Sequence, residues 1–563
     1  MTARRLGDLG VLRPAEERLL EQLDAGSYLQ FGDGRLPAAD DDARAIRAEL
    51  LRLVLLRGQD VPRLHENGLR LRGAWITGTL DLDGCHVGCD IALADCRLDA
   101  APILQAAAID TLLLDGCVLP GLRARRLQAR GSAYLRAAQV NGEIAMLGAR
   151  IGGELALDGS RIDAAGGTAF DASHVTVRGD LSARGARIAG RVRLVGADLA
   201  GDLAFVGTGI AHTEGTTLQA DGLRTDGDVS LQAARMEGEA SFIGARVSGD
   251  FRLDGGRFEA KGGRAVTLNR AVVEGAFFLR DEAKVNGALS LSGTTVGTVV
   301  DEAASWPARG DLLLNRFSYG GFLGGPVDAR ARLDWLARQD PTRWGDDFWP
   351  QPYAQLSAVL DGMGHQEEAR SVLFEKERLQ RRAHRARVKR PALRGLLLVK
   401  DWLLWATVGY GLQPLIAFIW LLGLWLTGVA LFGTLQAQEQ LRPNVPVTLR
   451  APEWVLCATP RTEQVPLVSI GATRPGLAAP GQSQLACFLA QPEAASFPKF
   501  NRWMYALETL VPGLEAGQRG YWSPDTRFTL GYAGKLFEYG QRIIGLALGL
   551  LAFAGFSGIV KSR

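Results

Sequence analysis

The sequence is poor in the residues that most often carry chemistry. Its 563 residues include six cysteines, six histidines and five methionines, and no CxxC pair, HExxH motif or haem-attachment motif is present. These absences remove the usual sequence evidence for a thiol redox centre, a zinc hydrolase or a cytochrome. No GxGxxG turn follows a predicted strand either. We therefore predict no cofactor and no catalytic residues.

The sequence also has little excess of one charge over the other. The chain has 64 lysines and arginines against 61 aspartates and glutamates, which gives a net charge of +3. Nucleic-acid binding would need a large local excess of basic residues, so we expect no nucleic-acid partner. Residues 1–23 contain no apolar stretch of the kind found in a signal peptide. We therefore expect the N-terminal part of the chain to stay in the cytoplasm.

Glycine, by contrast, is abundant, with 69 residues, and much of it belongs to a repeated phrase. Residues 179–190 read GDLSARGARIAG, and residues 227–238 read GDVSLQAARMEG. Large apolar residues in these phrases recur five and six positions apart, which fits short strands separated by corners and fits no helix. The phrases predict a mainly β fold, a right-handed quadrilateral β-helix solenoid of the pentapeptide-like type. It would cover residues 70–322 with about eleven coils.

A longer register lies above the phrase. Gly131, Gly179, Gly227 and Gly275 are spaced by 48 residues. We interpret each such unit as two coils of about 22 residues, plus a few extra residues in one loop. That loop contains a glycine at the same place in three units, and the stacked loops form a candidate docking edge for a protein partner: Gly167, Gly215 and Gly263.

Four cysteines within the predicted solenoid raise the question of a zinc site. Cys85, Cys96 and Cys117 follow phrase corners, at the place where other coils have alanine. Together with Cys89 they form a C-x3-C-x6-C-x20-C pattern, which matches no standard zinc spacing. We predict that these cysteines are small buried hydrophobic residues and that no metal is bound.

Helical segments flank the predicted solenoid. Residues 1–69 predict an N-terminal cap with a helix at 40–57, which has an acidic start and an apolar face. Residues 323–400 predict a small helical linker subdomain that ends in a basic run. Ten lysines and arginines of this run lie between positions 376 and 400. This pattern is typical of the cytoplasmic side of a membrane span and of contact with anionic headgroups.

Two apolar segments near the C-terminus are long enough to cross a bilayer. The first span is predicted at 413–434, within 401–435, and the second at 543–560, within 536–563. Basic residues precede the first span and follow the second, so both termini are expected in the cytoplasm and residues 436–535 outside. We therefore predict a multi-pass protein of the bacterial inner membrane.

The predicted external loop contains two cysteines and one amphipathic segment. Cys457 and Cys487 are its only cysteines, and in an oxidising compartment they predict one disulfide. Residues 496–513 predict a membrane-interface helix that rests on the bilayer or packs on the spans. Its apolar stripe consists of five residues: Phe500, Trp503, Met504, Leu507 and Leu510. A re-entrant helix that lines a pore is the alternative for this segment.

Residues 407–411 read TVGYG, the signature of a potassium-channel filter. In a channel this signature follows a pore helix, which itself follows an outer spanning helix. Here no predicted span precedes it, and the segment before it contains Lys400 and Asp401. We therefore interpret the motif as a chance match.

Several phrases carry a family resemblance. They are LRGAWITGTLDLDG at 71–84, IRAELLRLVLLRG at 46–58, TTLQADGLRTDGDVSL at 216–231 and FNRWMYALETLVPGLEAGQRGYW at 500–522. These phrases resemble a family of bacterial pentapeptide-repeat-like membrane proteins, and the resemblance covers nearly the whole chain. Members are often labelled membrane-associated oxidoreductases, but no motif of this sequence supports that activity.

Three functional hypotheses follow. The first is a membrane-anchored cytoplasmic β-helical scaffold without catalytic activity, whose partners are the lipid bilayer and another protein. The alternative is an oligomeric ion channel or pore subunit with a cytoplasmic solenoid, which needs several copies because two spans cannot enclose a pore. The third is the oxidoreductase that the resemblance implies.

Overall fold

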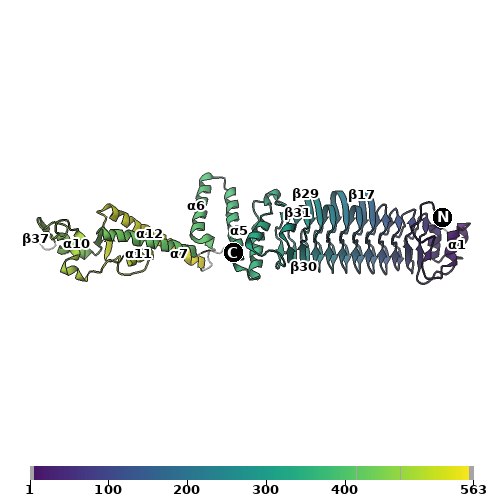
Figure 1. Cartoon of the computed structure of the whole chain (residues 1–563), viewed down its shortest axis with the longest axis horizontal. Coiled ribbons are helices and arrows are strands. Elements are labelled where there is room, and N and C mark those ends of the chain that lie inside the picture. Colours follow the sequence, from purple (N-terminus) through teal and green to yellow (C-terminus); the bar gives the residue numbers. More distant parts are fainter. Residues whose placement is uncertain (1–4, 412, 414, 469–470, 557–563) are drawn as a thin grey trace. The chain divides into compact units, whose positions relative to one another are not determined.

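A computed structural model describes residues 5–411, 413, 415–468 and 471–556. The chain divides into two compact units, Met1–Lys376 and Glu377–Arg563. Figure 1 shows both units, with the strands of the first and most of the long helices of the second. The division falls inside helix α5 (Gln366–Arg387), so this helix contributes residues to both units.

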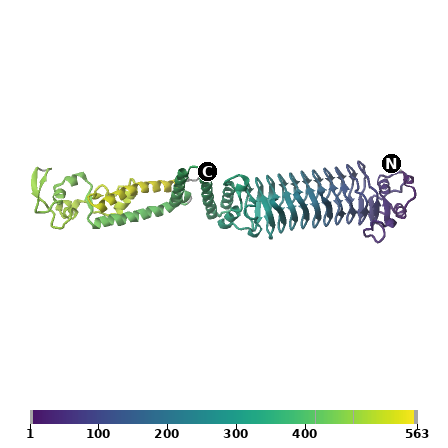
Figure 2. The same cartoon turned by 90° about the horizontal axis from the view of Figure 1, so that it is seen from above.

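The first unit is a parallel β-solenoid of about 11 turns. Its short strands stack coil upon coil from β3 (Leu69–Arg72) to β34 (Ser318–Tyr319), as Figures 1 and 2 show. Each coil buries one large residue per strand against the equivalent residue of the next coil. Ile162, for example, pairs with Ile188, which pairs with Ile210, and all three are buried. The parallel solenoid that the phrases predict is therefore confirmed.

The coils alternate in length. The alternation is seen in the sequence separations between the glycines and aspartates that stack from one coil to the next. The backbone N–H of Gly201 donates to the carbonyl of Gly179 in the preceding coil. Along the neighbouring aspartates, the sequence separation between bonded partners is 22 from Asp180 to Asp202 and 26 from Asp202 to Asp228. The 48-residue register predicted from the sequence is confirmed, because 22 and 26 sum to 48.

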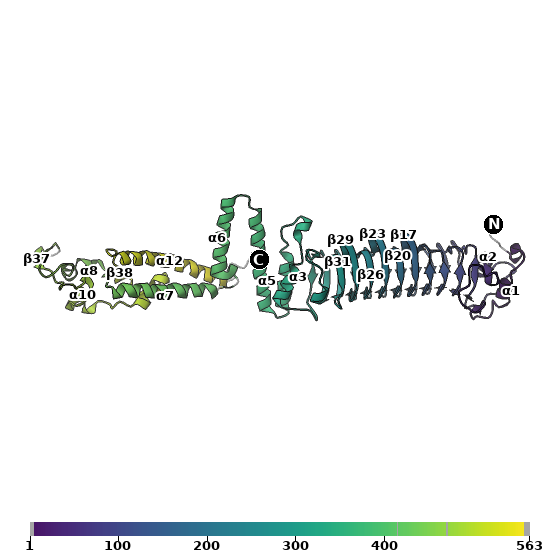
Figure 3. The same cartoon turned by 45° about the horizontal axis from the view of Figure 1, so that its top comes forward.

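The extra residues of the longer coils extend single strands on one side of the solenoid. These strands lie along one edge in Figure 3: β17 (Arg161–Asp171), β23 (Gly209–Gln219) and β29 (Arg257–Thr267). The sequence predicted a loop at these places. The added residues instead continue the strand, and the pairing with the neighbouring coil shifts register around them.

The N-terminal segment covers the first coil with both a strand and helices. Helix α1 (Pro14–Glu21) precedes strand β2 (Ala45–Arg47), which pairs with β4 (Trp75–Thr77). Helix α2 then runs over Ala48–Leu55, so the predicted helix at 40–57 is too long at both ends. Ala45 and Ile46 are fully buried in the sheet, and their pairing with the first coil outweighs the helical pattern of the segment.

Helices also follow the last coil. Helices α3 (Ala329–Leu336) and α4 (Gln351–Gly362) pack there, and Arg332 of α3 is fully buried. Its guanidinium binds both carboxylate oxygens of Asp301 at 2.7 and 2.8 Å and lies 3.6 Å from the ring centre of Phe322. A charged pair thus closes the apolar end of the solenoid.

The second unit contains helices α6 (Pro391–Val408), α7 (Leu415–Ala437), α11 (Arg502–Leu510) and α12 (Thr529–Phe556). Among the described residues, α7 and residues Thr529–Ala554 of α12 are long and apolar enough to cross a membrane. Helix α12 begins well before the span predicted at 543–560, and residues 557–560 of that prediction lie outside the described residues. The early start escapes prediction because charged residues interrupt the apolar pattern there.

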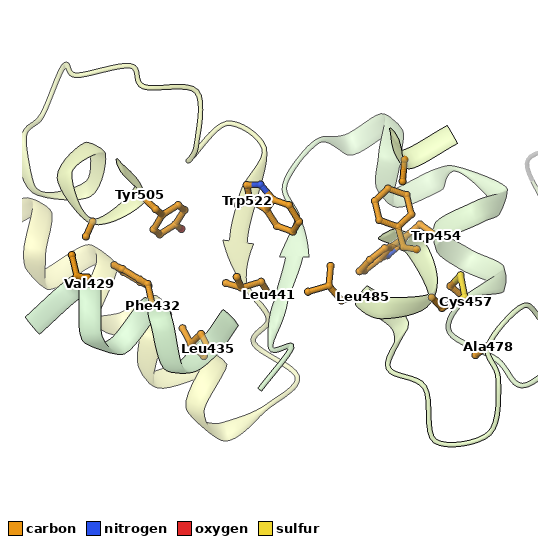
Figure 4. Packing of buried hydrophobic residues seen from close by; sticks show 14 residues of the cluster. Val429, Phe432, Leu435, Leu441, Trp454, Cys457, Ala478, Leu485, Tyr505 and Trp522 are labelled. Atoms are coloured by element: carbon orange, nitrogen blue, oxygen red, sulfur yellow. A yellow bond between two sulfur atoms is a disulfide. The ribbon is translucent and has the colours of Figure 1, made fainter. Parts of the chain in front are cut away.

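Between α7 and α12 the chain forms a small subdomain with its own hydrophobic cluster. Strands β35 (Leu441–Pro443) and β38 (Trp522–Pro524) pair antiparallel, and β36 (Gln464–Leu467) forms a hairpin with β37 (Ala472–Pro475). Figure 4 shows the cluster, which runs from Phe432 and Tyr505 past Trp522 to the disulfide. Short helices complete the subdomain: α8 (Pro446–Arg450), α9 (Pro452–Leu456) and α10 (Gln484–Leu489).

Candidate functional site

The outward face of the solenoid carries a row of basic side chains in register. These residues open successive strands on the side of β17, β23 and β29, and the parallel pairing aligns them. All of them are exposed: Arg161, Arg187, Arg235, Arg257 and Lys284. In one coil Gly209 takes this place, so the row has a single gap there. We call these five residues the basic row.

The three glycines of the predicted docking edge lie close to the basic row. Gly167, Gly215 and Gly263 lie within β17, β23 and β29, at the register shifts that accommodate the extra residues. All three are exposed, and a Cβ on Gly215 or Gly263 would meet nothing within 4 Å. The edge is therefore solvent-exposed, and β17 and β29 each contain both an edge glycine and a residue of the basic row.

A groove of about 470 Å³ lies at the C-terminal end of the solenoid. Its lining mixes charged, amide and aromatic side chains from β29, β31 (Lys284–Ser290) and the segment that follows Asp301. Trp306 in this lining is nearly buried, and its indole N–H donates to Asp301 at 2.8 Å. The groove is thus built on the same carboxylate that holds Arg332.

The solenoid cysteines lie where a small apolar residue fits. Cys96 and Cys117 are fully buried, and burial raises the pKa of the Cys117 thiol well above its usual value. Cys89 is buried as predicted, but the prediction of a buried Cys85 is wrong: this residue is only half-buried, and Arg52 of α2 donates to its thiol at 3.7 Å. Within the part of the chain that the structure describes, no three His, Cys, Asp or Glu side chains group as metal ligands.

In the second unit, α11 packs against both candidate spans, which also contact each other. A Cβ on Gly428 of α7 would lie 3.2 Å from Ala506, and the ring of Phe432 meets Tyr505 edge to face at 4.7 Å. On the other side, Gly545 of α12 lies against the carbonyl of Leu510. Small residues on both spans thus let α11 approach their backbones closely.

The buried and exposed faces of α11 divide the predicted apolar stripe. Tyr505, Ala506 and Thr509 are fully buried where α11 packs against α7 and α12. Trp503 and Met504 of the stripe are exposed, at 44% and 40%. Of the remaining stripe residues, Leu510 is buried, Leu507 is partly buried, and Phe500 packs against the hydrophobic cluster. The sequence did not reveal the buried face because it contains polar residues.

Polar side chains of α12 bind α11 and the segment that follows it. Gln541, 1% exposed, donates to the carbonyls of Ala506 and Leu424 at 3.2 and 3.3 Å and accepts a hydrogen bond from Thr509 at 2.9 Å. Glu538, also buried, accepts from Tyr505 and Lys535. These contacts compensate polar groups inside an otherwise apolar helix.

Glu508 ties the chain after α11 back onto the helix. Its carboxylate is 5% exposed and accepts the backbone N–H groups of Gln518 and Arg519 at 2.8 and 3.1 Å. The Arg519 guanidinium lies 3.7 Å from Glu538. Residues 511–518 therefore form a closed loop with α11. We call residues 511–518 the return segment. No motif in the sequence signals this pairing.

A disulfide joins Cys457 to Cys487, with 5.6 Å between their Cα atoms. Both cysteines are buried in the cluster of Figure 4, beside Trp454 and Phe488. The bond links the end of α9 to α10. It therefore holds together the subdomain between the candidate spans.

The TVGYG residues form the connection between α6 and α7. Thr407 and Val408 belong to α6, and Gly409 and Tyr410 have left-handed backbone with φ of +54° and +58°. A buried carboxylate, Asp401 of α6, binds Arg381 and Arg385 of α5 beside this turn. The motif thus forms the end of α6 and the turn that leads to α7.

The outer face of α6 is strongly apolar. Its large apolar side chains are exposed in the single chain: Leu396, Leu398, Val399, Trp402, Leu403 and Trp405. The same helix carries the basic residues Arg394 and Lys400. An apolar helix face with basic neighbours is typical of a helix that lies in a membrane interface.

No family model, curated protein or solved structure matches the chain.

Proposed function

We propose that the chain is a membrane-anchored scaffold whose solenoid binds a protein partner along the basic row. The observation that carries this proposal is the register of the solenoid, which aligns an outward basic residue in five coils and leaves one gap at Gly209. Stacked coils offer a long and regular surface of this kind, on which a partner contacts many equivalent positions. The proposal includes right-handed, four-sided coils and assigns the solenoid no catalytic step.

The anchor in this proposal consists of α7 and α12. The basic residues of α5 and α6 precede α7, and the disulfide lies in the segment between the two helices. Basic residues favour the cytoplasmic side of a membrane, and disulfides persist in oxidising compartments. Both features support a multi-pass arrangement in a bacterial inner membrane, with the solenoid and both termini in the cytoplasm.

The scaffold proposal is tested by reversing charge on one face of the solenoid and comparing a matched face. The triple variant R187E/R235E/R257E removes most of the basic row. The control R150E/R224E/R246E reverses three arginines that are also exposed and share one column on the other sheet of the solenoid. Proteins cross-linked to the full-length chain in native membranes are quantified for both variants and for the unmodified chain.

We expect the basic-row variant to lose at least nine-tenths of one specific partner, because like charges would then face the partner's surface. The control should retain that partner. Equal recovery by both variants, or recovery of the bait alone from all three chains, would contradict the proposal.

A further inference from the structure

Helix α11 reaches the middle of the candidate spans. The 23 residues of α7 extend roughly 34 Å at about 1.5 Å per residue, and their midpoint lies near Trp425. Arg502, at the start of α11, packs at Gly433, close to the end of α7. Leu510, at the end of α11, lies against Gly545, one helical turn from Gln541, which binds the carbonyl of Leu424. The helix therefore descends from one end of α7 to its midpoint.

The chain then returns to the side from which it came. Glu508 binds the amides of Gln518 and Arg519, and the carbonyl of Tyr521 accepts the N–H of Asn444, which follows α7. Strand β38 next joins β35, at the same end of α7. If α7 and α12 cross a bilayer, as proposed above, α11 and the return segment form a re-entrant hairpin.

The return segment brings non-helical backbone to mid-depth. Residues 511–515 are exposed in the single chain and are followed by Gly517, whose φ is +70°. Exposed irregular backbone does not occur in contact with lipid tails, because its N–H and C=O groups would lack hydrogen-bond partners there. It is tolerated only where other protein covers it or where it lines a water-filled cavity. One hairpin beside two helices cannot enclose such a cavity, so further copies of the chain must complete it.

We infer that copies of this chain assemble around an axis and that their return segments line a water-filled pore that conducts cations. Glu515 is exposed within the return segment. Repetition of this carboxylate in every copy makes a ring of negative charge, which favours cations over anions. Arg519 is paired with Glu538, which compensates its positive charge near the ring. This inference rests on the membrane insertion of the proposed function, but not on the solenoid's partner.

The first test measures water access to the return segment in the full-length chain reconstituted into liposomes. Leu514 and Leu422 are exposed by 37% and 53% in the single chain, and Leu422 lies on α7 near the same depth. The variants L514C and L422C are treated with a charged, membrane-impermeant thiol reagent, and labelling is read peptide by peptide by mass spectrometry.

The thiol introduced by L514C should react at least tenfold faster than the thiol introduced by L422C, because only position 514 faces water. Equal, slow rates at both positions would overturn the inference.

The second test measures conduction and its sign. The same liposomes are fused to planar bilayers under a tenfold KCl gradient. The unmodified chain should carry current whose reversal potential has the sign of the potassium equilibrium potential. E515K should shift the reversal potential toward the chloride equilibrium potential. A mass in detergent of several times 60.5 kDa is expected for both chains. Absence of current from both chains, or a single-copy mass, would overturn the inference.

The two proposals fail in different ways. If alkaline carbonate extracts the chain from its membranes, the anchor itself is wrong. If the chain resists extraction while the L514C thiol stays protected or no current flows, the anchor stands and the pore is wrong.

Discussion

At the scale of single residues, buried charges show where regular packing ends. Arg332 and Asp301 are buried together where the solenoid stops and α3 begins. A buried pair of this kind contributes little net stability by itself, but loss of one partner leaves an uncompensated charge in an apolar environment. Arg332 therefore fixes how the end of the solenoid is closed.

The variant R332M is expected to lower the free energy of unfolding of the full-length chain by about 3 to 5 kcal/mol, because the Asp301 carboxylate then loses its main partner. The control R309M breaks the largely exposed Arg309–Asp334 pair, 72% and 40% exposed, and should cost less than about 1 kcal/mol. Unfolding in detergent is followed by circular dichroism of the β-structure. Equal losses for both variants would show that the buried pair does not hold the cap.

Residue types alone predicted part of this chemistry. The corner spacing of Cys96 and Cys117 was enough to place them in the core. The same spacing wrongly predicted a buried Cys85, which is half-buried and accepts a hydrogen bond from Arg52 of α2. The partners of Glu538 and Glu508 could not be predicted. Glu538 binds Tyr505, 33 residues away, and Glu508 binds amides across the return segment, so neither contact produces a local pattern.

At the scale of elements, neighbouring coils of the solenoid are joined by a repeated Gly-Asp pair, in which glycine stacks on glycine and aspartate on aspartate. The Asp202 carboxylate accepts the backbone N–H of Asp228 at 2.8 Å, and Asp228 does the same for Asp250. These carboxylates occupy the space that a side chain on the stacked glycines would need. The repeated GD of the phrase is therefore a stacking device.

The variant G227A should destabilise the chain by about 1 to 3 kcal/mol, because its Cβ would clash with the Asp202 carboxylate and lie 2.9 Å from the carbonyl carbon of Gly201. The control G209A adds the same methyl group at the gap in the basic row, where nothing lies within 4 Å. It should change stability by less than about 0.5 kcal/mol. Thermal unfolding of both variants checks the pair, and an equally stable G227A would contradict the stacking account.

Periodicity predicted the elements well where each coil repeats its neighbour. It was less accurate at the ends, where a strand replaces part of a predicted helix because Ala45 and Ile46 pair with the first coil. It also placed the start of the second span too late. Helix α12 continues through Lys535 and Glu538 because these side chains bind each other, and Tyr505 of α11 donates to Glu538. A hydropathy pattern does not register such partners.

At the scale of the whole molecule, the chain combines a solenoid with a helical unit that contains two helices long and apolar enough to cross a membrane. The four solenoid cysteines are free thiols, whereas Cys457 and Cys487 are bonded. This difference is expected if the two regions lie in different redox compartments. The difference supports the proposal that a bilayer separates the two regions.

The most direct test labels one introduced cysteine on each side. Val11 and Val468 are almost equally exposed, at 93% and 96%, and lie in the first unit and in the segment between α7 and α12. V11C and V468C are expressed in bacterial cells, and an impermeant thiol reagent is applied to right-side-out and inverted membrane vesicles. The chain without an added cysteine gives the background. The account predicts that right-side-out vesicles label V468C alone and inverted vesicles label V11C alone, whereas labelling of both variants from the same side would contradict it.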